Sequence, residues 1–538
     1  MIIPDFNLQV PGQAGIWNLE SGTERISMTN QVRVRFAPSP TGPLHIGGVR
    51  TALYNYLFAR HTGGKMILRI EDTDQNRYVP GAENYIIDSL TWTGIRFDEG
   101  VHVGGPFAPY RQSDRKEIYR RYADELIGNG HAYYGFDTAE ELDALRKEAE
   151  KEKKVFTYDA SVRKALKNSL VLSAEETRGR LDSGEPYVIR FKIPENEILS
   201  FHDLIRGDMN VNTNTLDDKV LFKSDGMPTY HLANITDDHL MEISHVIRGE
   251  EWLPSLPLHI LLYRAFEWQP PLFAHLPLIL KPEGSGKLSK RDGDRLGFPV
   301  FPLEWHDPFT KEVSSGYRES GYFPETVVNM LALLGWNPGT EQEIFTMEEL
   351  IDEFSIERVG KSGSRFDPGK IKWFNHHYLV SKPIAELTSL FRKILKNKGI
   401  DADDDFIDKV VELVKDRSDF VSNFWEQSFF FFEAPTAYDT EVVRKKWKED
   451  TPGLLMSFKE ILPGIKDFRA ENIKAAAESL VQEKGTGLGQ LMNPLRLCLV
   501  GGSFGPDLSL ICEMLGAGEV ASRIGLALDH LKEQGVIT

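Results

Sequence analysis

The stretch Val32-Arg-Val-Arg-Phe-Ala-Pro-Ser-Pro-Thr-Gly-Pro-Leu-His-Ile-Gly-Gly48 begins the first regular pattern in the chain. Apolar residues alternate with arginines over 32–36, which predicts a β-strand, and a proline-rich loop follows. Apolar residues between 49 and 57 then recur at helical spacing, until Gly63-Gly64 ends the helix. The next strand is Met66-Ile-Leu-Arg-Ile70, which completes a βαβ unit. A βαβ unit predicts a parallel sheet.

This alternation of strands and helices is interrupted and then resumes. Residues 112–225 mix charged helices with strands such as 187–193, which predicts an insertion. Beyond it, a strand ends in Val246-Ile-Arg-Gly-Glu-Glu251, a leucine-rich helix runs near 256–266, and 275–280 is another apolar strand. From 381 onwards the patterns are nearly all helical. The sequence therefore predicts an α/β, Rossmann-like parallel-sheet domain that is split by an α+β insertion and followed by an all-α C-terminal region.

The composition indicates a soluble protein of several domains. A chain of 538 residues has room for roughly three to five of them. The two cysteines, Cys498 and Cys512, cannot form a disulfide framework or a four-ligand zinc site, so we expect free thiols in a reducing cytoplasm. The N-terminus has no signal-peptide pattern, and no apolar run reaches the roughly 18 residues of a membrane span. We interpret the polar residues 1–30 as a flexible extension, with Met28 as an alternative start.

The formal net charge of −17 argues by itself against a nucleic-acid partner. It is a weak argument, because a polyanion needs only one basic face on the protein. The net charge therefore excludes neither a nucleic-acid-binding protein nor one that binds no nucleic acid.

His45 and the glycines that follow it form a strand-to-helix turn suited to a nucleotide. Small residues let a nucleotide approach the backbone, and the free N–H groups at a helix start bind phosphate. A lone histidine beside glycines is ordinarily a packing or capping residue. The unbroken run of specific residues from Arg35 to Gly48 favours a binding site instead.

A second motif is the basic run Lys287-Leu-Ser-Lys-Arg291. The preceding Gly284-Ser-Gly resembles part of a P-loop, but that motif needs a glycine where Lys281 stands. A short lysine-rich segment alone is most simply a surface loop. Together with the first motif, it is better interpreted as a mobile cationic loop that reaches a triphosphate.

The two motifs resemble the signatures of class I aminoacyl-tRNA synthetases, histidine–isoleucine–glycine–histidine and lysine–methionine–serine–lysine–serine. Within that class, Phe36-Ala-Pro-Ser-Pro-Thr-Gly42 is similar to the bacterial glutamyl enzymes. The resemblance extends over about 31–530, most strongly in 32–95 and 219–340. It includes Arg69-Ile-Glu-Asp-Thr-Asp74, Tyr230-His-Leu-Ala-Asn234, Asp237-Asp-His239, the stretch 246–252 and Gly335-Trp336.

Three departures from the family pattern stand out. Gly48 replaces the second histidine of the first signature, so no side chain can contact phosphate from that position. Leu288 and Arg291 replace the methionine and the last serine of the second signature. Between Gly297 and Ser315 the chain carries an aromatic, proline-rich stretch that we interpret as an insertion forming a packed surface loop, and no function is assigned to it.

The resemblance implies a nucleotide site at the carboxyl ends of the parallel strands. ATP enters as a substrate with Mg²⁺, which the phosphate oxygens and water mainly hold. Lys290 is expected to stabilise the charge that develops on the phosphates, and no protein nucleophile is required. The implied catalytic residues are His45, Lys287 and Lys290, and the implied ATP-binding residues are Thr41, His45, Gly47, Gly48 and Lys290.

The resemblance also implies a site for glutamate, which carries two carboxylates and one ammonium group. Two arginines and one glutamate match those charges, and we assign Arg248 to the side-chain carboxylate. The alternative is that Arg35 and Arg248 form internal salt bridges with Glu71 or Glu251. The implied glutamate-binding residues are Arg35, Ala37, Ser39, Glu71, Tyr230, Asn234 and Arg248.

The remaining regions are assigned by the same resemblance, with tRNA(Glu) as the partner. No cysteine stands near Tyr133, where some members keep zinc ligands, so we predict no zinc and no other protein-bound metal. A monomer is expected, without membrane attachment. The predicted divisions are the extension 1–30, the halves of the catalytic domain at 31–111 and 226–285, the acceptor-stem-binding insertion 112–225, the stem-contact region 286–380 and the helical anticodon-binding region 381–538.

Two other functions compete with this interpretation. A glutaminyl-tRNA synthetase has a different loop after the first strand and β-barrels in place of the helical C-terminus. A non-catalytic tRNA-binding relative need not keep His45 and Lys290. Whether tRNA(Gln) also receives glutamate depends on the anticodon-binding residues, and mischarging of purified tRNAs decides it.

Overall fold

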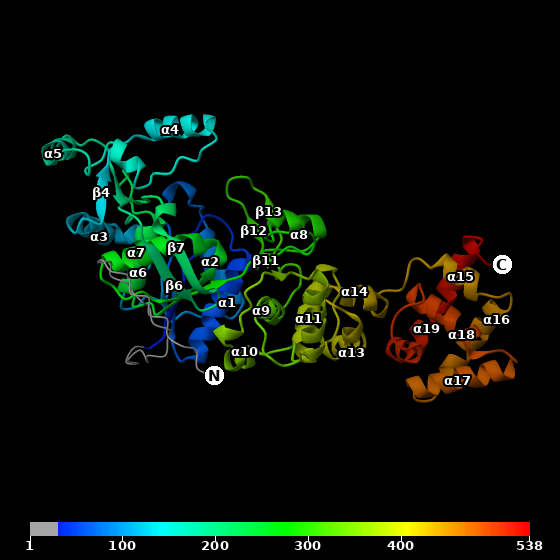
Figure 1. The fold of residues 1–538 in the computed structure, drawn as a ribbon. Helices are drawn as coiled ribbons and strands as arrows, with labels where there is room; N and C mark the ends of the chain where they lie inside the picture. Colours follow the sequence, from blue (N-terminus) through cyan, green and yellow to red (C-terminus); the bar gives the residue numbers. More distant parts are fainter. Residues whose placement is uncertain (1–30, 538) are drawn as a thin grey trace, which may run out of the picture. The chain divides into compact units, whose positions relative to one another are not determined.

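The computed structural model describes residues 31–537, which divide into two compact units (Figure 1). The first unit runs to Ser320 and includes Val327–Pro368. The second comprises Gly321–Thr326 and the chain from Gly369 onwards. The predicted extension 1–30, with Met28, lies outside the described residues.

The first half of the main sheet contains the predicted βαβ unit. Strand β1 (Arg33–Phe36) pairs in parallel with β2 (Lys65–Leu68), which pairs in parallel with β3 (Glu99–Gly100). Helix α1 (Ile46–His61) connects β1 to β2 and buries its apolar residues. All four side chains of β1 are buried, as expected for a parallel strand that is covered on both faces. The predicted order of strand, loop, helix and strand is confirmed.

The second half of the sheet consists of four strands, β6 (Ile198–Asp203), β7 (Gly207–Asn212), β9 (His245–Gly249) and β10 (Leu272–Leu276). Their order is β7-β6-β10-β9, with β7 antiparallel and the other three parallel. The N–H of Ser244 donates to the carbonyl of Arg33 at 2.9 Å, so β9 begins beside β1. Helices α6 (Tyr230–Leu240) and α7 (Leu256–Ala265) share one apolar core with these strands. Strands β6 and β7 lie within the predicted insertion, yet they extend the main sheet.

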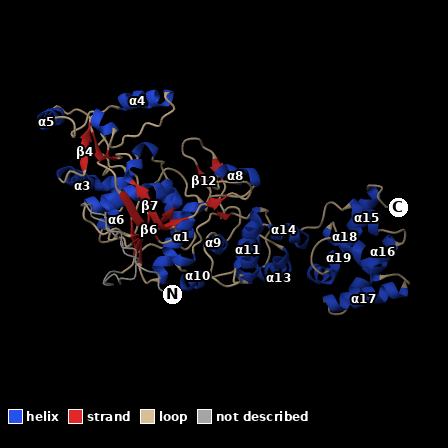
Figure 2. Ribbon diagram, in the orientation of Figure 1, coloured by secondary structure: helices blue, strands red, loops and turns tan. Residues whose placement is uncertain are grey.

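The rest of the insertion forms a second sheet of three antiparallel strands, β4 (Ala132–Gly135), β5 (Val188–Phe191) and β8 (Val220–Phe222). Their apolar side chains join the same core as α6 and α7. The charged helices of the insertion, drawn in blue in Figure 2, bury few of their residues. They are α3 (Lys116–Gly128), α4 (Ala139–Lys151) and α5 (Ala174–Asp182).

The stretch 297–315 packs against the domain, as predicted, and part of it forms a β-hairpin instead of an irregular loop. It follows α8 (Lys290–Leu296) and forms a hairpin of β12 (Trp305–His306) and β13 (Val313–Ser314). The aromatic and apolar residues of its first half are buried against the N-terminal half of the domain, whereas Phe309 and Val313 in the hairpin are exposed. The carbonyl of Val300 accepts the N–H of Ile46 at 3.0 Å, and the carbonyl of Leu303 accepts the Tyr85 hydroxyl at 2.5 Å. The buried members are Phe298, Val300, Phe301, Leu303 and Trp305.

The remaining elements of the first unit are short. They are α2 (Ala82–Trp92), α10 (Met347–Glu353) and the strand pair β11 (Ile279–Leu280) and β14 (Ser364–Arg365). Helix α9 (Pro324–Leu333) begins in the second unit and ends in the first.

The second unit is helical, as predicted, and Figure 2 draws its labelled elements as helices. Phe430 and Phe431 lie in its apolar core. Cys498 and Cys512 are free and buried, and burial raises the pKa of each thiol to about 12. Over the described length of the chain, no helix has both the length and the apolar character to cross a membrane. The helices are α11 (Pro368–Ser381), α12 (Ile384–Asn397), α13 (Asp404–Val414), α14 (Asn423–Ser428), α15 (Thr440–Lys446), α16 (Thr451–Ile461), α17 (Ala470–Glu483), α18 (Leu488–Val500) and α19 (Leu508–Glu533).

Candidate active site

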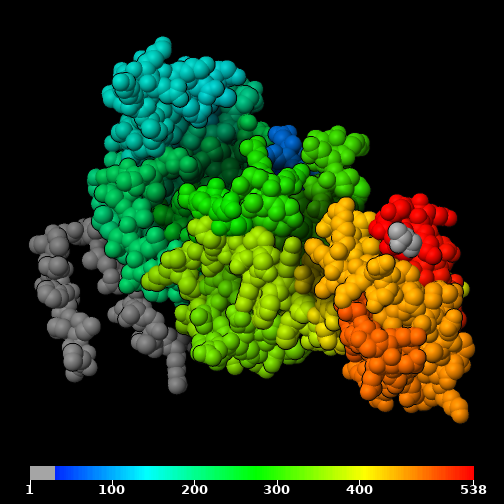
Figure 3. Space-filling model, turned by 90° about the vertical axis from the view of Figure 1, so that its right-hand side faces the viewer, coloured from blue at the N-terminus to red at the C-terminus, as the bar shows by residue number. Residues whose placement is uncertain are grey.

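A cavity of about 610 Å³ opens at the carboxyl ends of β1 and β9, where an open parallel sheet usually binds ligands. Figure 3 shows blue N-terminal atoms recessed between the teal insertion and the green segment of the second half. Nearly every predicted site residue lines this cavity, although the motifs are far apart in the chain. These residues are Arg35, Ala37, Ser39, Thr41, His45, Gly47, Gly48, Glu71, Tyr230, Asn234, Arg248 and Lys287.

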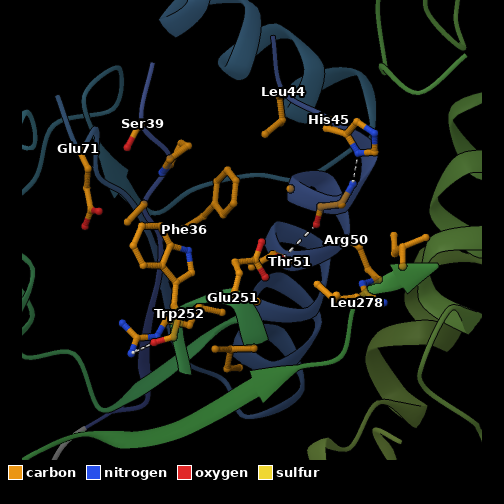
Figure 4. A pocket seen from close by; sticks show the side chains of 18 of the residues that line it. Phe36, Ser39, Leu44, His45, Arg50, Thr51, Glu71, Glu251, Trp252 and Leu278 are labelled. Carbon is orange, nitrogen blue, oxygen red and sulfur yellow. Dashed lines mark hydrogen bonds between the residues drawn. The ribbon is translucent and has the colours of Figure 1, made fainter. Parts of the chain in front are cut away.

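His45 caps the start of α1 and leaves one ring nitrogen unused (Figure 4). Its Nδ1 accepts the N–H of Gly47 at 3.1 Å, so Nε2 carries the ring hydrogen. That Nε2 is buried and has no hydrogen-bond partner among the described residues. Burial, together with the charge of Lys287, lowers the pKa of His45 to about 4, so the ring is neutral at pH 7. An unpaired donor at a helix N-terminus is suited to a phosphate oxygen.

Gly48 lies directly beneath the Leu44 side chain in the turn. A Cβ at Gly48 would lie 2.5 Å from Leu44 Cδ1 and 3.8 Å from the Phe36 ring. The turn packs Leu44 directly over this position, and Figure 4 shows Leu44 and Phe36 at the cavity wall. A side chain at position 48 would therefore have to displace the end of the Leu44 side chain.

The two lysines of the second motif are separated by the structure. Lys287 lines the cavity and forms an ion pair with Glu251 at 2.8 Å. Lys290 is the first residue of α8 and does not line the cavity. Its Nζ lies 3.5 Å from a carboxylate oxygen of Glu312, which belongs to the 297–315 hairpin. The expected approach of Lys290 to the nucleotide is therefore absent from this conformation.

Arg35 has an acidic partner that the sequence interpretation missed. Its Nε and Nη2 donate to both carboxylate oxygens of Asp238, at 3.0 and 3.2 Å. Asp238 also accepts from Arg69 at 2.7 Å, and all three side chains are buried. The predicted alternative, a salt bridge of Arg35 to Glu71 or Glu251, is not formed. Arg35 Nη1 makes no hydrogen bond to any described residue, and it is the donor left for a ligand.

Glu71 is buried and held through one of its two oxygens. Arg69 Nη2 and Asn234 Nδ2 both donate to Oε1, each at 2.9 Å. Oε2 has no hydrogen-bond partner in the described part of the chain, and Glu71 lines the cavity beside Ser39 (Figure 4). One carboxylate oxygen is therefore available for a cationic group.

Arg248 is a buried cation without an acidic partner. Its Nη1 donates to the Tyr230 hydroxyl at 2.8 Å, and its Nη2 makes only a 3.5 Å contact with the carbonyl of Trp252. No carboxylate between residues 31 and 537 lies within 4 Å of its guanidinium, although the residue is only 4% exposed. The Tyr230 and Trp252 rings contact each other at 4.3 Å between centroids, tilted by 34°, and line this end of the cavity. A buried, uncompensated cation favours binding of an anion.

The described residues contain no group of three or more histidine, cysteine, aspartate or glutamate side chains arranged to hold a metal ion. Absence of zinc remains a prediction. Stoichiometric zinc in metal analysis of the purified protein would contradict it.

Comparisons with known proteins agree with this geometry. The family model described as the catalytic domain of class I tRNA synthetases (E and Q) matches residues 31–373, and the anticodon-binding-domain model matches 385–528. The chain is 59% identical to the glutamate–tRNA ligases of Christiangramia forsetii and Flavobacterium johnsoniae over 505 residues, covering 94% of this chain and 100% of each relative.

A solved structure gives the same result. The crystal structure of a glutamate tRNA ligase from Elizabethkingia meningosepticum, in complex with its amino acid, is similar with a TM-score of 0.92. The identity is 52%, and the match covers 93% of this chain and 100% of that one. The predicted resemblance and fold class are confirmed. This chain belongs to the class I tRNA synthetases of the E and Q group.

Proposed function

We propose that this chain is a glutamate–tRNA ligase, which joins L-glutamate to the 3′ end of tRNA(Glu) with ATP through a glutamyl-adenylate. The observation that carries the proposal is the set of unused charged atoms in one cavity. Arg35 Nη1 and Arg248 Nη2 are two cationic donors, and Glu71 Oε2 is one anionic acceptor. Glutamate carries the complementary two carboxylates and one ammonium. The relatives named glutamate–tRNA ligase, at 59% identity, support the same activity.

The two ends of the substrate are assigned by these contacts. Arg248 with Tyr230 receives the side-chain carboxylate, since no acidic side chain among residues 31–537 pairs with it. Glu71, with Ser39, receives the ammonium group. Arg35 and Asn234 orient the α-carboxylate, and Ala37 lets the amino acid approach the backbone. Glutamine would present a neutral amide to Arg248, which pairs poorly with a buried guanidinium.

The first reaction forms the adenylate. The α-carboxylate of glutamate attacks the α-phosphorus of ATP, one oxygen–phosphorus bond forms, and the bond to the leaving pyrophosphate breaks. Thr41, Gly47, Gly48 and the Nε2 of His45 hold the phosphates at the start of α1. Lys287 and Lys290 stabilise the charge on the leaving group. Mg²⁺ enters with ATP, and phosphate oxygens and water hold it.

The second reaction transfers glutamate to RNA. The terminal ribose hydroxyl attacks the adenylate carbonyl carbon, and AMP leaves with the bonding electron pair. We assign the insertion 112–225 to the 3′ end of the tRNA, 286–380 to the stem and 381–538 to the anticodon. A cytoplasmic monomer is the proposed working form.

The proposal is tested by glutamate-dependent exchange of pyrophosphate into ATP, measured with tRNA(Glu) present, because this branch of the family typically needs tRNA to form the adenylate. Exchange with glutamate, and little with glutamine, is expected. If glutamine supports faster exchange than glutamate, glutamine is the substrate and the proposal is wrong. No exchange with either amino acid would indicate a non-catalytic tRNA-binding protein.

A further inference from the structure

A chain of three buried side chains leads away from the amino-acid end of the cavity. Arg248 on β9 donates through Nε to His275 Nε2 at 3.0 Å. His275, its register partner on β10, contacts Asp203 Oδ2 through Nδ1 at 2.6 Å. Asp203 ends β6, which pairs with β10. His275 and Asp203 are fully buried, and neither lines the cavity.

The hydrogen bonds define the state of the histidine ring. An ionised carboxylate only accepts, so Nδ1 of His275 carries the hydrogen that Asp203 accepts. Arg248 only donates, so Nε2 carries none. The ring is therefore neutral, with its donor towards Asp203 and its acceptor towards Arg248.

Asp203 cannot easily turn away from this arrangement. Its second oxygen accepts the backbone N–H groups of Ile205 and Arg206, at 3.0 and 2.8 Å. The same oxygen lies 3.3 Å from the backbone nitrogen of His275. The carboxylate is therefore fixed on one side by the backbone and on the other by the imidazole.

The interposed histidine has a consequence that a direct ion pair lacks. In the pair of Arg35 and Asp238, the carboxylate occupies two guanidinium nitrogens. At Arg248, by contrast, His275 contacts only Nε, and the imidazole ring separates the Asp203 carboxylate from the guanidinium. Arg248 is thus oriented and partly compensated, while its Nη2, which has only the 3.5 Å contact with the Trp252 carbonyl, can turn to a ligand carboxylate.

We propose that Asp203 and His275 are positioning residues that act through Arg248 to set the preference for a substrate carboxylate over an amide. The inference rests on the proposed function and extends it, because it assigns amino-acid specificity to a residue of the predicted RNA-binding insertion.

Asp203→Asn is the direct test, with KM and kcat for glutamate measured in the tRNA-dependent exchange assay. The amide presents a donor to His275, which favours the other ring tautomer and turns an N–H towards Arg248. We expect the KM for glutamate to rise at least tenfold, and KM for ATP and kcat at saturating glutamate to stay within threefold. A glutamate KM within twofold of the wild type, or an equal rise for ATP, overturns the proposal.

Two further comparisons separate positioning from folding. Glu99→Gln removes another buried carboxylate, which pairs with Arg33 at 2.7 Å away from the cavity, and should lower thermal stability without changing KM for glutamate. His275→Gln keeps a donor and an acceptor, whereas His275→Leu keeps neither. We expect glutamine to retain more glutamate affinity than leucine, and equal losses in the two variants contradict the relay even if Asp203→Asn fails to fold. A wild-type enzyme without glutamate-dependent exchange would refute the proposed function itself, whereas normal wild-type exchange with an unchanged Asp203→Asn KM refutes only the relay.

Discussion

The two ends of the cavity hold their charges in different ways. At the amino-acid end, Arg69, Glu71 and Asp238 have side chains that are 0%, 6% and 1% exposed, and each bonds to more than one partner. At the phosphate end, Lys287 and Lys290 are 55% and 42% exposed, and each has a single carboxylate partner. Buried, multiply bonded charges hold one geometry, whereas exposed pairs contribute little and exchange partners readily.

This difference separates the proposed binding of the amino acid from the proposed reaction at the phosphates. The amino-acid end is preorganised, so the proposed glutamate site has its donors and acceptors already in place. The phosphate end must change, because Lys290 is paired with Glu312 away from the cavity in this conformation. The five predictions that follow test whether the two ends really differ, from the largest expected effect to the smallest.

Asp238→Asn should have the largest effect, on stability. The change leaves the buried guanidinium groups of Arg35 and Arg69 under-compensated, which costs about 3–5 kcal/mol in the free energy of unfolding. Asp143→Asn, at an exposed pair with Arg146, is the control and should change it by less than about 1 kcal/mol. Urea denaturation measures both, and equal small losses would show that burial does not distinguish the two pairs.

The same carboxylate predicts a pH dependence. Burial alone raises the pKa of Asp238, but the charges of Arg35 and Arg69 outweigh it, so the net pKa is lowered. A lowered folded-state pKa stabilises the protein above the unfolded value of about 3.9, and this stability is lost as pH falls through the folded pKa. Asp238→Asn should therefore flatten the acid limb of stability against pH.

Arg248→Gln should impair glutamate use. The substrate carboxylate is then buried against a neutral amide, which costs about 2–4 kcal/mol in kcat/KM. Steady-state exchange kinetics measure it, and Arg60→Gln, which breaks a half-buried pair with Asp98, should stay within twofold. A loss of less than tenfold for Arg248→Gln would falsify its role.

Lys290→Ala should slow adenylate formation by about 100-fold while leaving KM for glutamate within threefold, because the lysine is proposed to stabilise the charge that develops on the phosphates. Arg295→Ala, on the same helix with an exposed partner at 3.4 Å, is the matched control and should be nearly unchanged. Single-turnover kinetics in the presence of tRNA separate this step from product release. An unchanged rate of adenylate formation in Lys290→Ala would show that Lys290 does not stabilise the phosphate charge.

Glu312→Gln should have the smallest effect. It releases Lys290 from an exposed pair worth about 0.2–1 kcal/mol, so KM for ATP should fall by no more than about threefold, and only at low salt. Glu304→Gln, which frees His306 on the same hairpin, controls for a change in local charge. A large or salt-independent effect would mean that Glu312 does more than pair with Lys290.

Local patterns predicted much of the fold, and the family resemblance supplied the predicted site residues that line the cavity. The period-2 strand at 32–36 and the helix after it were predictable because their apolar residues recur at the spacing that burial requires. The family motifs then brought His45, Glu71 and Arg248 to one cavity. The roles of these residues remain proposals.

What sequence did not predict depends on contacts between distant segments. The pairing of Arg35 with Asp238 joins residues 203 positions apart, and no local pattern carries it. The position of Lys290 depends on Glu312, in a stretch interpreted as a surface loop. Strand β6 alternates buried and exposed residues. This pattern fits the main sheet and the smaller sheet of the insertion equally well, so the sequence did not predict which of them β6 joins.

The hydrogen bond between the Ile46 N–H and the Val300 carbonyl works as a tether. It fixes the chain just beyond α8 to the start of the helix that is proposed to hold phosphate. The seven residues of α8 begin at Lys290 itself, and a helix advances only about 1.5 Å per residue towards this anchor. While α8 stays folded, the radius over which Lys290 can travel is short. Exchange of Glu312 for a phosphate is thus a local side-chain and loop movement that the rest of the first unit need not follow.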